Sequence, residues 1–217
     1  MFMQIQQLSL PDFFKNYYTK FPNLTPIQEK AVNAGLLNNK SLLICAPTAS
    51  GKTLVATMAI ANTLDKGKAI YLVPLKALAN EKYNEYKNLF STTNYKVVQS
   101  TGDVDSESSY LANYDLLILT TEKLDSLLRH HIPWISQVKT VIVDEIHLLN
   151  DHSRGPTLEI ILTLLKQLIK PQIVGLSATI GNPQELAQWL EADLVQDNWR
   201  PVELKQGIRL GDKTEFY

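Results

Sequence analysis

The clearest chemical pattern in the sequence is the stretch Ala-Pro-Thr-Ala-Ser-Gly-Lys-Thr, which runs from Ala46 to Thr53. It follows an apolar run at residues 42–45 that is typical of a buried strand, and an Ala-rich run typical of a helix comes after it. Such a turn presents backbone N–H groups to phosphate, Lys52 reaches the β- and γ-phosphates, and the Thr53 hydroxyl ligates Mg²⁺. Ala46 stands where these loops usually begin with Gly. The pattern predicts a nucleoside triphosphate site formed by Pro47, Thr48, Ala49, Ser50, Gly51, Lys52 and Thr53.

Two adjacent carboxylates, Asp144 and Glu145, form the second chemical pattern. They follow the largely apolar residues 140–143, at the carboxyl end of an expected buried strand. Beside a phosphate loop, the first carboxylate can hold Mg²⁺ and the second can position or deprotonate the attacking water. The two roles can differ because successive strand residues point to opposite faces. We predict Lys52, Asp144 and Glu145 as catalytic residues, and Thr53 and Asp144 as Mg²⁺ ligands. The alternative is an ordinary solvated strand end.

Strands and helices must position these residues, and the chain alternates between the two. Apolar runs of strand length lie at 42–45, 69–73, 96–100, 116–120, 140–144 and 172–176. Helices are expected at 52–64, 75–89, 122–129, 157–169 and 183–190. This alternation predicts an α/β fold with a mostly parallel sheet, helices on both faces and ligands at the carboxyl ends of the strands. The residues from Asn198 onward lack helical periodicity and are expected to form an edge strand or the start of a connector.

The composition of the 217 residues is ordinary for a globular protein, with 45% hydrophobic and 20% charged residues. No apolar run approaches the roughly 20 residues that span a bilayer, so no membrane partner is expected. The single cysteine, Cys45, lies in an apolar strand, which favours a reducing, cytoplasmic location. The net charge of −1 argues against a strongly basic nucleic-acid binder, although the first 100 residues hold 11 Lys and Arg against 5 Asp and Glu.

The carboxylate pair continues as Ile146-His147, and the stretch Ser177-Ala178-Thr179 follows another expected strand. With the phosphate loop, these motifs stand in the order and spacing of a known family. From Phe21 to Val202 the sequence resembles the first motor lobe of a DExH-box superfamily 2 helicase, closest to the archaeal DNA repair helicases that act at stalled replication forks. The resemblance implies a RecA-like P-loop NTPase domain that uses ATP and Mg²⁺.

The segment Leu24–Gln28 resembles the part of this family that recognises adenine. The resemblance implies that the amide of Gln28 pairs with adenine N6 and N7, a match that its geometry favours. The segment can also be simply a helix start, with Thr25 as the N-cap and Pro26 in the first helical position. Both can hold at once.

The resemblance implies two further roles. The hydroxyls of Ser177 and Thr179 would hydrogen-bond toward the carboxylate motif and couple the nucleotide site to strand movement, with His147 as a relay. Segments beginning at Val73, at Thr101 (Thr-Gly-Asp) and at Thr120 would grip one nucleic-acid strand, since hydroxyls, helix N-terminal amides and Lys side chains suit phosphate oxygens. The implied contacts are Pro74, Lys76, Thr101, Gly102, Thr121 and Lys123.

The resemblance divides the chain into an ATP-binding domain at residues 1–200 and a connector at residues 201–217 that leads toward a second lobe. That lobe would supply an arginine finger, worth roughly 10³–10⁵ in rate in related systems. We therefore expect part of a longer helicase that translocates 3′ to 5′ on single-stranded or forked DNA. Alone, it would bind ATP but unwind poorly.

Three other interpretations stay open. An RNA-directed helicase lobe of the same superfamily would carry the same residues, because this half of the motor does not read the 2′-OH unambiguously. A non-catalytic, nucleotide-gated binding module would not need the full set of predicted catalytic residues. A P-loop kinase would leave Gln28 and Ser177-Ala178-Thr179 unexplained.

Overall fold

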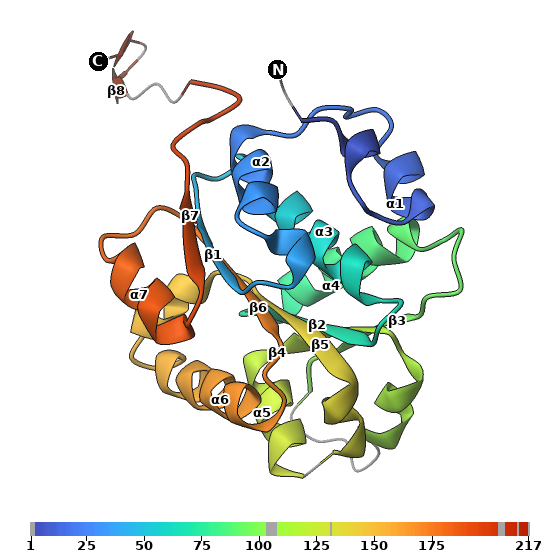
Figure 1. The fold of residues 1–217 in the computed structure, drawn as a ribbon. Coiled ribbons are helices and arrows are strands. Elements are labelled where there is room, and N and C mark those ends of the chain that lie inside the picture. Colours follow the sequence, from blue (N-terminus) through green and yellow to red (C-terminus); the bar gives the residue numbers. More distant parts are fainter. Residues whose placement is uncertain (1–2, 103–107, 131, 204–206, 212, 217) are drawn as a thin grey trace.

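The computed structural model describes residues 3–102, 108–130, 132–203, 207–211 and 213–216. Its centre is a seven-stranded parallel sheet with the order β3-β4-β2-β5-β6-β1-β7 (Figure 1). The strands are β1 (Leu42–Cys45), β2 (Lys68–Val73), β3 (Val97–Ser100), β4 (Leu116–Thr120), β5 (Val138–Val143), β6 (Gln172–Ser177) and β7 (Asp193–Gln196). The predicted α/β fold is confirmed.

Helices cover both faces of the sheet, because successive side chains of each central strand enter opposite hydrophobic cores. In β2, for example, Tyr71 lies in one core and Leu72 in the other. The core of Tyr71 includes side chains from α1 (Asp12–Tyr17), α2 (Pro26–Asn33), α3 (Lys52–Thr63) and α4 (Lys76–Leu89). The core of Leu72 includes α5 (Thr121–Arg129), α6 (Gly155–Leu168) and α7 (Pro183–Leu190). Short 3₁₀ helices are η1 (Ile5–Gln7), η2 (Leu36–Asn38), η3 (Ser108–Asn113), η4 (Pro133–Gln137) and η5 (Ile146–Asn150).

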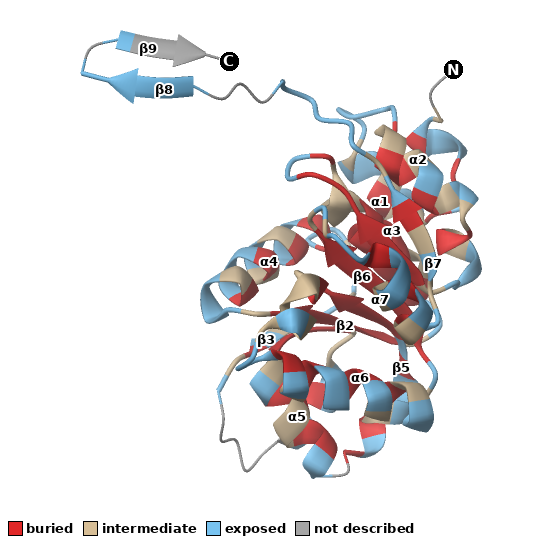
Figure 2. Ribbon diagram, turned by 90° about the vertical axis from the view of Figure 1, so that its left-hand side faces the viewer, coloured by how far each residue is buried: buried red, intermediate tan, exposed pale blue. Residues whose placement is uncertain are grey.

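The structure differs from the predicted elements at an edge of the sheet, at the end of β5 and in the C-terminal residues. One of the two edge strands is β7, which precedes Asn198 and has only one buried side chain, so it lacks the apolar run that marks the central strands. β5 ends at Val143, which leaves Asp144 just beyond the strand. After residue 203, β8 (Gly207–Leu210) and β9 (Lys213–Phe216) form an antiparallel hairpin, and β8 is exposed along its length (Figure 2). The division of the chain near residue 200 stays a prediction.

The strand order divides the predicted site residues into two neighbouring groups. β5, β6 and β1 are adjacent, and the carboxylate pair, Ser177 and the phosphate loop lie at their carboxyl ends. β3, β4 and β2 are also adjacent, and the segments predicted to contact nucleic acid follow them. Because the carboxyl ends of parallel strands share one edge of the sheet, the two groups lie side by side along that edge.

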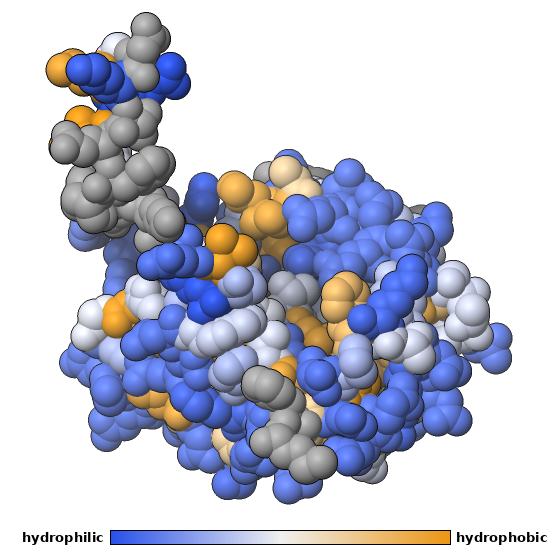
Figure 3. All heavy atoms as spheres, turned by 90° about the horizontal axis from the view of Figure 1, so that it is seen from above, coloured by the Kyte–Doolittle hydropathy of each residue, from blue (hydrophilic) through white to orange (hydrophobic). Residues whose placement is uncertain are grey.

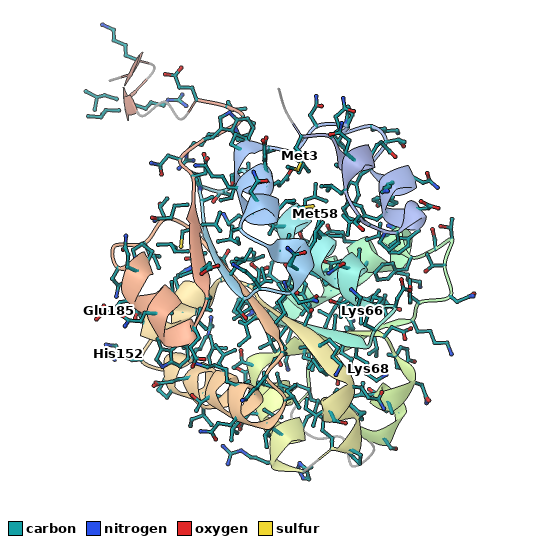
Figure 4. The ribbon with its side chains drawn as sticks, viewed as in Figure 1. Met3, Met58, Lys66, Lys68, His152 and Glu185 are labelled. Atoms are coloured by element: carbon teal, nitrogen blue, oxygen red, sulfur yellow. The ribbon has the colours of Figure 1, made fainter. Side chains whose placement is uncertain are left out.

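The strands form a buried centre (Figure 2), and Met58 of α3 belongs to this interior (Figure 4). Lys68 at the start of β2 is also buried, and its Nζ donates to the carbonyl oxygens of Ala112 and Tyr114, each across 2.7 Å.

Seen from above, most of the surface is hydrophilic (Figure 3). Within the described ranges, no helix has the length and apolar character needed to cross a bilayer.

Candidate active site

The phosphate loop joins β1 to α3 and is anchored at its base. Ala46 is fully buried, and its N–H donates to the carbonyl oxygen of Ser177 on the neighbouring β6 across 3.2 Å. Its φ is not in the left-handed region, which in this loop is occupied by Ala49 (φ 65°) and Gly51 (φ 100°). A residue with a Cβ is therefore compatible with the position where such loops usually have Gly.

Lys52, the first residue of α3, directs its Nζ back into the loop. Nζ donates to the carbonyl oxygens of Ala46 across 2.6 Å and of Pro47 across 2.9 Å. Burial lowers the pKa of Lys52, and the nearby carboxylates of Glu145 and Asp144 oppose this shift. The ammonium group thus lies within electrostatic reach of both carboxylates. Its present partners are loop carbonyls that a phosphate group could replace.

The N-terminus of α2 holds the loop from another side. Thr25 Oγ1 donates to the carbonyl oxygen of Ser50 across 2.8 Å, and Gln28 Nε2 donates to that of Gly51 across 3.0 Å. Gln28 Oε1 accepts from the N–H of Thr25 across 2.9 Å, which completes a capping box. The predicted helix start, with Pro26 in the first position, is therefore confirmed. Each end of the buried amide makes one of the two hydrogen bonds it can form, and its pairing with adenine stays a prediction.

The carboxylate pair follows β5 in a tight turn. Asp144 N–H continues the sheet by donating to the carbonyl oxygen of Leu72 across 3.0 Å. Glu145 lies in the left-handed region (φ 50°), where non-glycine residues are uncommon and strain often marks a functional site. Because both carboxylates lie beyond Val143, this turn, rather than the alternation expected within a strand, sets their directions. Asp144 Oδ1 accepts from Glu145 N–H and Oδ2 accepts from the Tyr71 hydroxyl, each across 3.0 Å.

The electrostatic state of Asp144 reflects its partial burial. Burial raises the pKa of Asp144, and the hydrogen bond from Tyr71 opposes that rise. The neighbouring Glu145 charge adds to the rise, and Lys82 on α4 opposes it. A carboxylate that is partly desolvated gains from a nearby cation, which suits a metal ligand.

Ile146 anchors the turn against β6. It is fully buried, and a Cβ placed on Gly175 would lie 2.9 Å from Ile146 Cδ1, so a larger residue at Gly175 would require the Ile146 side chain to shift. His147 follows, with its Nδ1 3.3 Å from Glu145 Oε2 but without the geometry of a hydrogen bond. The turn therefore places His147 beside the second carboxylate.

The hydrogen bond predicted from Ser177 toward the carboxylate motif is not formed in this structure. Ser177 is fully buried as the last residue of β6, and its Oγ has no hydrogen-bond partner among the described residues. Burial of the strand end removes this hydroxyl from the surface, whereas Thr179 is exposed. The coupling role of these two residues with His147 stays a prediction.

The residues predicted to contact nucleic acid are not equally accessible. Lys123 is only 1% exposed, because α5 turns it into the protein, and its contact with a nucleic-acid strand stays a prediction. Asp103 of the second segment lies outside the described residues. The others are half-buried or exposed at the ends of adjacent strands: Pro74, Lys76, Thr101, Gly102 and Thr121.

The side chains at the loop fit the requirements of Mg²⁺ and a triphosphate. Mg²⁺ prefers oxygen ligands and usually takes one or two from protein, with phosphates and water completing the shell. The carboxylate of Asp144 and the hydroxyl of Thr53 are ligands of this kind. Where the chain is described, no group of three or more His, Cys, Asp or Glu forms a separate metal site. Ser50 Oγ is also buried in the loop, and it has no hydrogen-bond partner among the described residues.

Tyr71 is a site residue that the sequence does not predict. A signal is present, since Tyr71 is the one aromatic side chain with a polar tip in the run Ala69–Val73. Its partner could not be read from the sequence, because Asp144 belongs to a different strand.

Known proteins resemble this chain over most of its length. A family model described as DEAD/DEAH box helicase matches residues 25–186. The chain is 54% identical over 201 residues to the ATP-dependent DNA helicase Hel308 of Methanocaldococcus jannaschii, and 50% identical over 210 residues to Hel308 of Pyrococcus horikoshii. These matches cover 89% and 95% of this chain, but the chain spans only 17% and 29% of the two relatives.

Solved structures agree with the fold. The DUF1998 helicase MrfA bound to DNA has a TM-score of 0.72 and 25% identity over 88% of this chain and 30% of that one. Another MrfA structure, at 24% identity, has a TM-score of 0.77 over 89% of this chain and 33% of that one, and it supports the fold alone. The matched family region extends from the N-cap of α2 into α7 and includes both the phosphate loop and the carboxylate pair. This chain therefore belongs to the DEAD/DEAH box helicase family.

Proposed function

We propose that this chain is the ATP-binding motor lobe of an ATP-dependent DNA helicase. The observation that carries the proposal is the placement of Lys52 and Thr53 after β1, and of Asp144 and Glu145 after β5, on either side of β6. The influence of both carboxylates on the pKa of Lys52 supports their proximity. A binding module without hydrolysis would not require this combination of a cation, a hydroxyl and two carboxylates.

In this proposal, ATP supplies the phosphoanhydride bond whose hydrolysis drives movement, and Mg²⁺ would neutralise the charge that develops on the phosphates. Lys52 exchanges its loop carbonyls for oxygens of the β- and γ-phosphates. Thr53 and Asp144 provide the protein ligands for the metal. Glu145 orients the attacking water and accepts its proton.

The nucleic acid would lie along the adjacent ends of β2, β3 and β4. Lys76 at the start of α4 is exposed, and Thr121 begins α5, so a cation and helix N-terminal amides are available for phosphate oxygens. We propose single-stranded or forked DNA as the partner and 3′ to 5′ movement, as the family resemblance implies. The names of the two relatives support DNA over RNA. A second lobe would complete the motor, and the cytoplasmic location expected from Cys45 stays a prediction.

A titration of this chain with a fluorescent ATP analogue and Mg²⁺ tests the nucleotide site. We expect saturable binding that Lys52→Ala weakens by about tenfold or more, because a charge-assisted phosphate contact is lost. Lys66→Ala, which alters an exposed lysine just after α3, is the matched control and should bind as wild type does. A folded wild-type chain without binding, or equal binding by Lys52→Ala, would refute the site.

Hydrolysis is tested by Glu145→Gln in a protein that carries both lobes. The substitution should leave nucleotide affinity nearly unchanged and reduce the ATPase rate by orders of magnitude, since it removes the proposed base. An unchanged rate would place the base elsewhere. Competition between DNA and RNA single strands of equal length then tests the DNA assignment, and tighter binding of RNA would favour the RNA-directed alternative.

A further inference from the structure

Tyr71 stands directly behind the proposed metal ligand Asp144. It lies on β2, which pairs with β5 in a register that sets Tyr71 opposite Ile142, two residues before Asp144. Both Tyr71 and Ile142 belong to the core on the side of α3, the helix that the phosphate loop opens. Asp144 follows directly after β5, and its N–H still donates to the carbonyl oxygen of Leu72 on β2, which brings its carboxylate within reach of the Tyr71 hydroxyl.

The contact between these two side chains is specific. The Tyr71 hydroxyl donates to Asp144 Oδ2 across 3.0 Å, while Glu145 N–H donates to Oδ1 across 3.0 Å. The carboxylate is therefore held at both oxygens, from two sides. Each oxygen keeps a lone pair for a metal or a water ligand.

The state of the phenol suits a permanent donor. Tyr71 is fully buried, and burial raises its pKa well above the ordinary value, with the Asp144 charge adding to the rise. A phenol hydroxyl is neutral near pH 7 at its ordinary pKa of about 10, so it donates to the carboxylate as a charged acceptor, the stronger kind of hydrogen bond. Packing fixes its ring, which lies 5.8 Å from the ring of Tyr86 (centroid to centroid).

We propose that Tyr71 is a positioning residue for the metal, which orients the Asp144 carboxylate toward Mg²⁺ through this hydrogen bond. The inference rests on the proposed nucleotide site. Partners that orient metal ligands in this way typically change metal affinity by about 10- to 100-fold when they are lost. A tyrosine that served only to fill the core would have no such effect once its ring is kept.

Tyr71→Phe separates the two possibilities, because it removes the hydroxyl and keeps the ring. Tyr86→Phe is the matched control, since it removes a second buried phenol hydroxyl whose partner is Thr57 Oγ1, 3.1 Å away, and not Asp144. We measure the dissociation constant of a fluorescent ATP analogue in EDTA and divide it by the dissociation constant in saturating Mg²⁺. The ratio reports the contribution of the metal, whereas thermal melts report any general loss of stability.

We expect Tyr71→Phe to lower this ratio about tenfold while leaving the affinity in EDTA unchanged, and Tyr86→Phe to keep the wild-type ratio. In an Asp144→Asn background, Tyr71→Phe should cause no further loss, because the two residues act through one contact. A wild-type ratio in Tyr71→Phe, or an equal loss in Tyr86→Phe, would overturn the inference while leaving the nucleotide site intact. A wild-type chain that binds the analogue equally with and without Mg²⁺ would instead remove the metal role of Asp144, and this inference with it.

Discussion

The side-chain amide of Gln28 donates to the carbonyl oxygen of Gly51 across 3.0 Å and ties the first turn of α2 to the phosphate loop. The approach is so close that a Cβ on Gly51 would lie 2.2 Å from Gln28 Nε2, and Gly51 also has a φ of 100° that disfavours other residues. The shape of the loop therefore depends on a residue 23 positions earlier in the chain.

Replacing Gln28 by Ala should destabilise the protein. The substitution removes one side of the capping box on Thr25 and leaves the Gly51 carbonyl without its donor, so we expect a loss of about 1–2 kcal/mol in the free energy of unfolding. Urea denaturation measures this loss. A variant as stable as wild type would mean that water or another donor replaces the amide at no cost.

The same variant tests whether Gln28 also reads adenine. Pairing with adenine would use the second N–H of Nε2 and the second lone pair of Oε1, so it would appear as selectivity for ATP over GTP that Gln28→Ala abolishes. The ratio of the two affinities, measured for wild type and variant, is the readout. Equal weakening for both nucleotides would assign Gln28 to the loop alone.

Lys76 and Lys123 should behave differently toward a DNA single strand. Lys76 is exposed at the start of α4, so Lys76→Met should weaken binding and reduce the slope of log K against log salt by about 0.7, the value for one phosphate contact. Lys123→Met should leave the slope unchanged, because an ammonium that is 1% exposed makes no such contact. Fluorescence anisotropy over a salt series measures both, and a reduced slope in Lys123→Met would show that α5 opens on binding.

Asp151 should make the stability depend on pH in acid. Its Oδ1 accepts from Ser153 N–H and Arg154 N–H, each across 2.9 Å, and from Ser153 Oγ across 2.6 Å. These bonds, that of the hydroxyl foremost, lower the pKa of Asp151 from 3.8 to about 2. A depressed pKa in the folded state means stabilisation that is complete above about pH 4 and is lost as the pH falls toward 2.

Asp151→Asn should therefore lower Tm at pH 7, and the difference from wild type should shrink as the pH falls from about 4 to about 2. Glu159→Gln, which neutralises an exposed carboxylate on α6, is the control and should change Tm little at any pH. A difference between Asp151→Asn and wild type that stays constant across this range would contradict the assignment.

Gln172, the first residue of β6, should contribute to stability at the amino ends of the strands. Its Nε2 donates to the carbonyl oxygens of Leu36 across 2.8 Å and Lys40 across 2.9 Å, and its Oε1 accepts from Thr140 Oγ1 across 3.0 Å. Gln172→Leu would leave these buried groups without their partner, at a cost of about 2 kcal/mol or more. Gln99→Leu on the exposed side of β3 is the matched control for the added apolar side chain. Equal urea midpoints for the two variants would refute this.

Features that are local in the chain can be predicted from the order of the residues. The phosphate loop is a strand, a turn and a helix start within about a dozen residues, so the types and order of those residues were enough to predict it. The central strands were predictable because strands buried on both faces need continuous apolar runs. The edge strand β7, with one buried residue, has no such run and was missed.

Contacts between residues far apart in the chain depend on how the strands and helices pack. Tyr71 and Asp144 are 73 positions apart, and they touch because the sheet places β2 beside β5 in one particular register. The burial of Lys123, and the lack of a hydrogen-bond partner for Ser177 Oγ among the described residues, likewise follow from how α5 and β6 pack, which the residue types alone do not specify. Strands, turns and helix starts depend on residues that are neighbours in the chain. The partners of a side chain depend instead on strand order and on the packing of both cores.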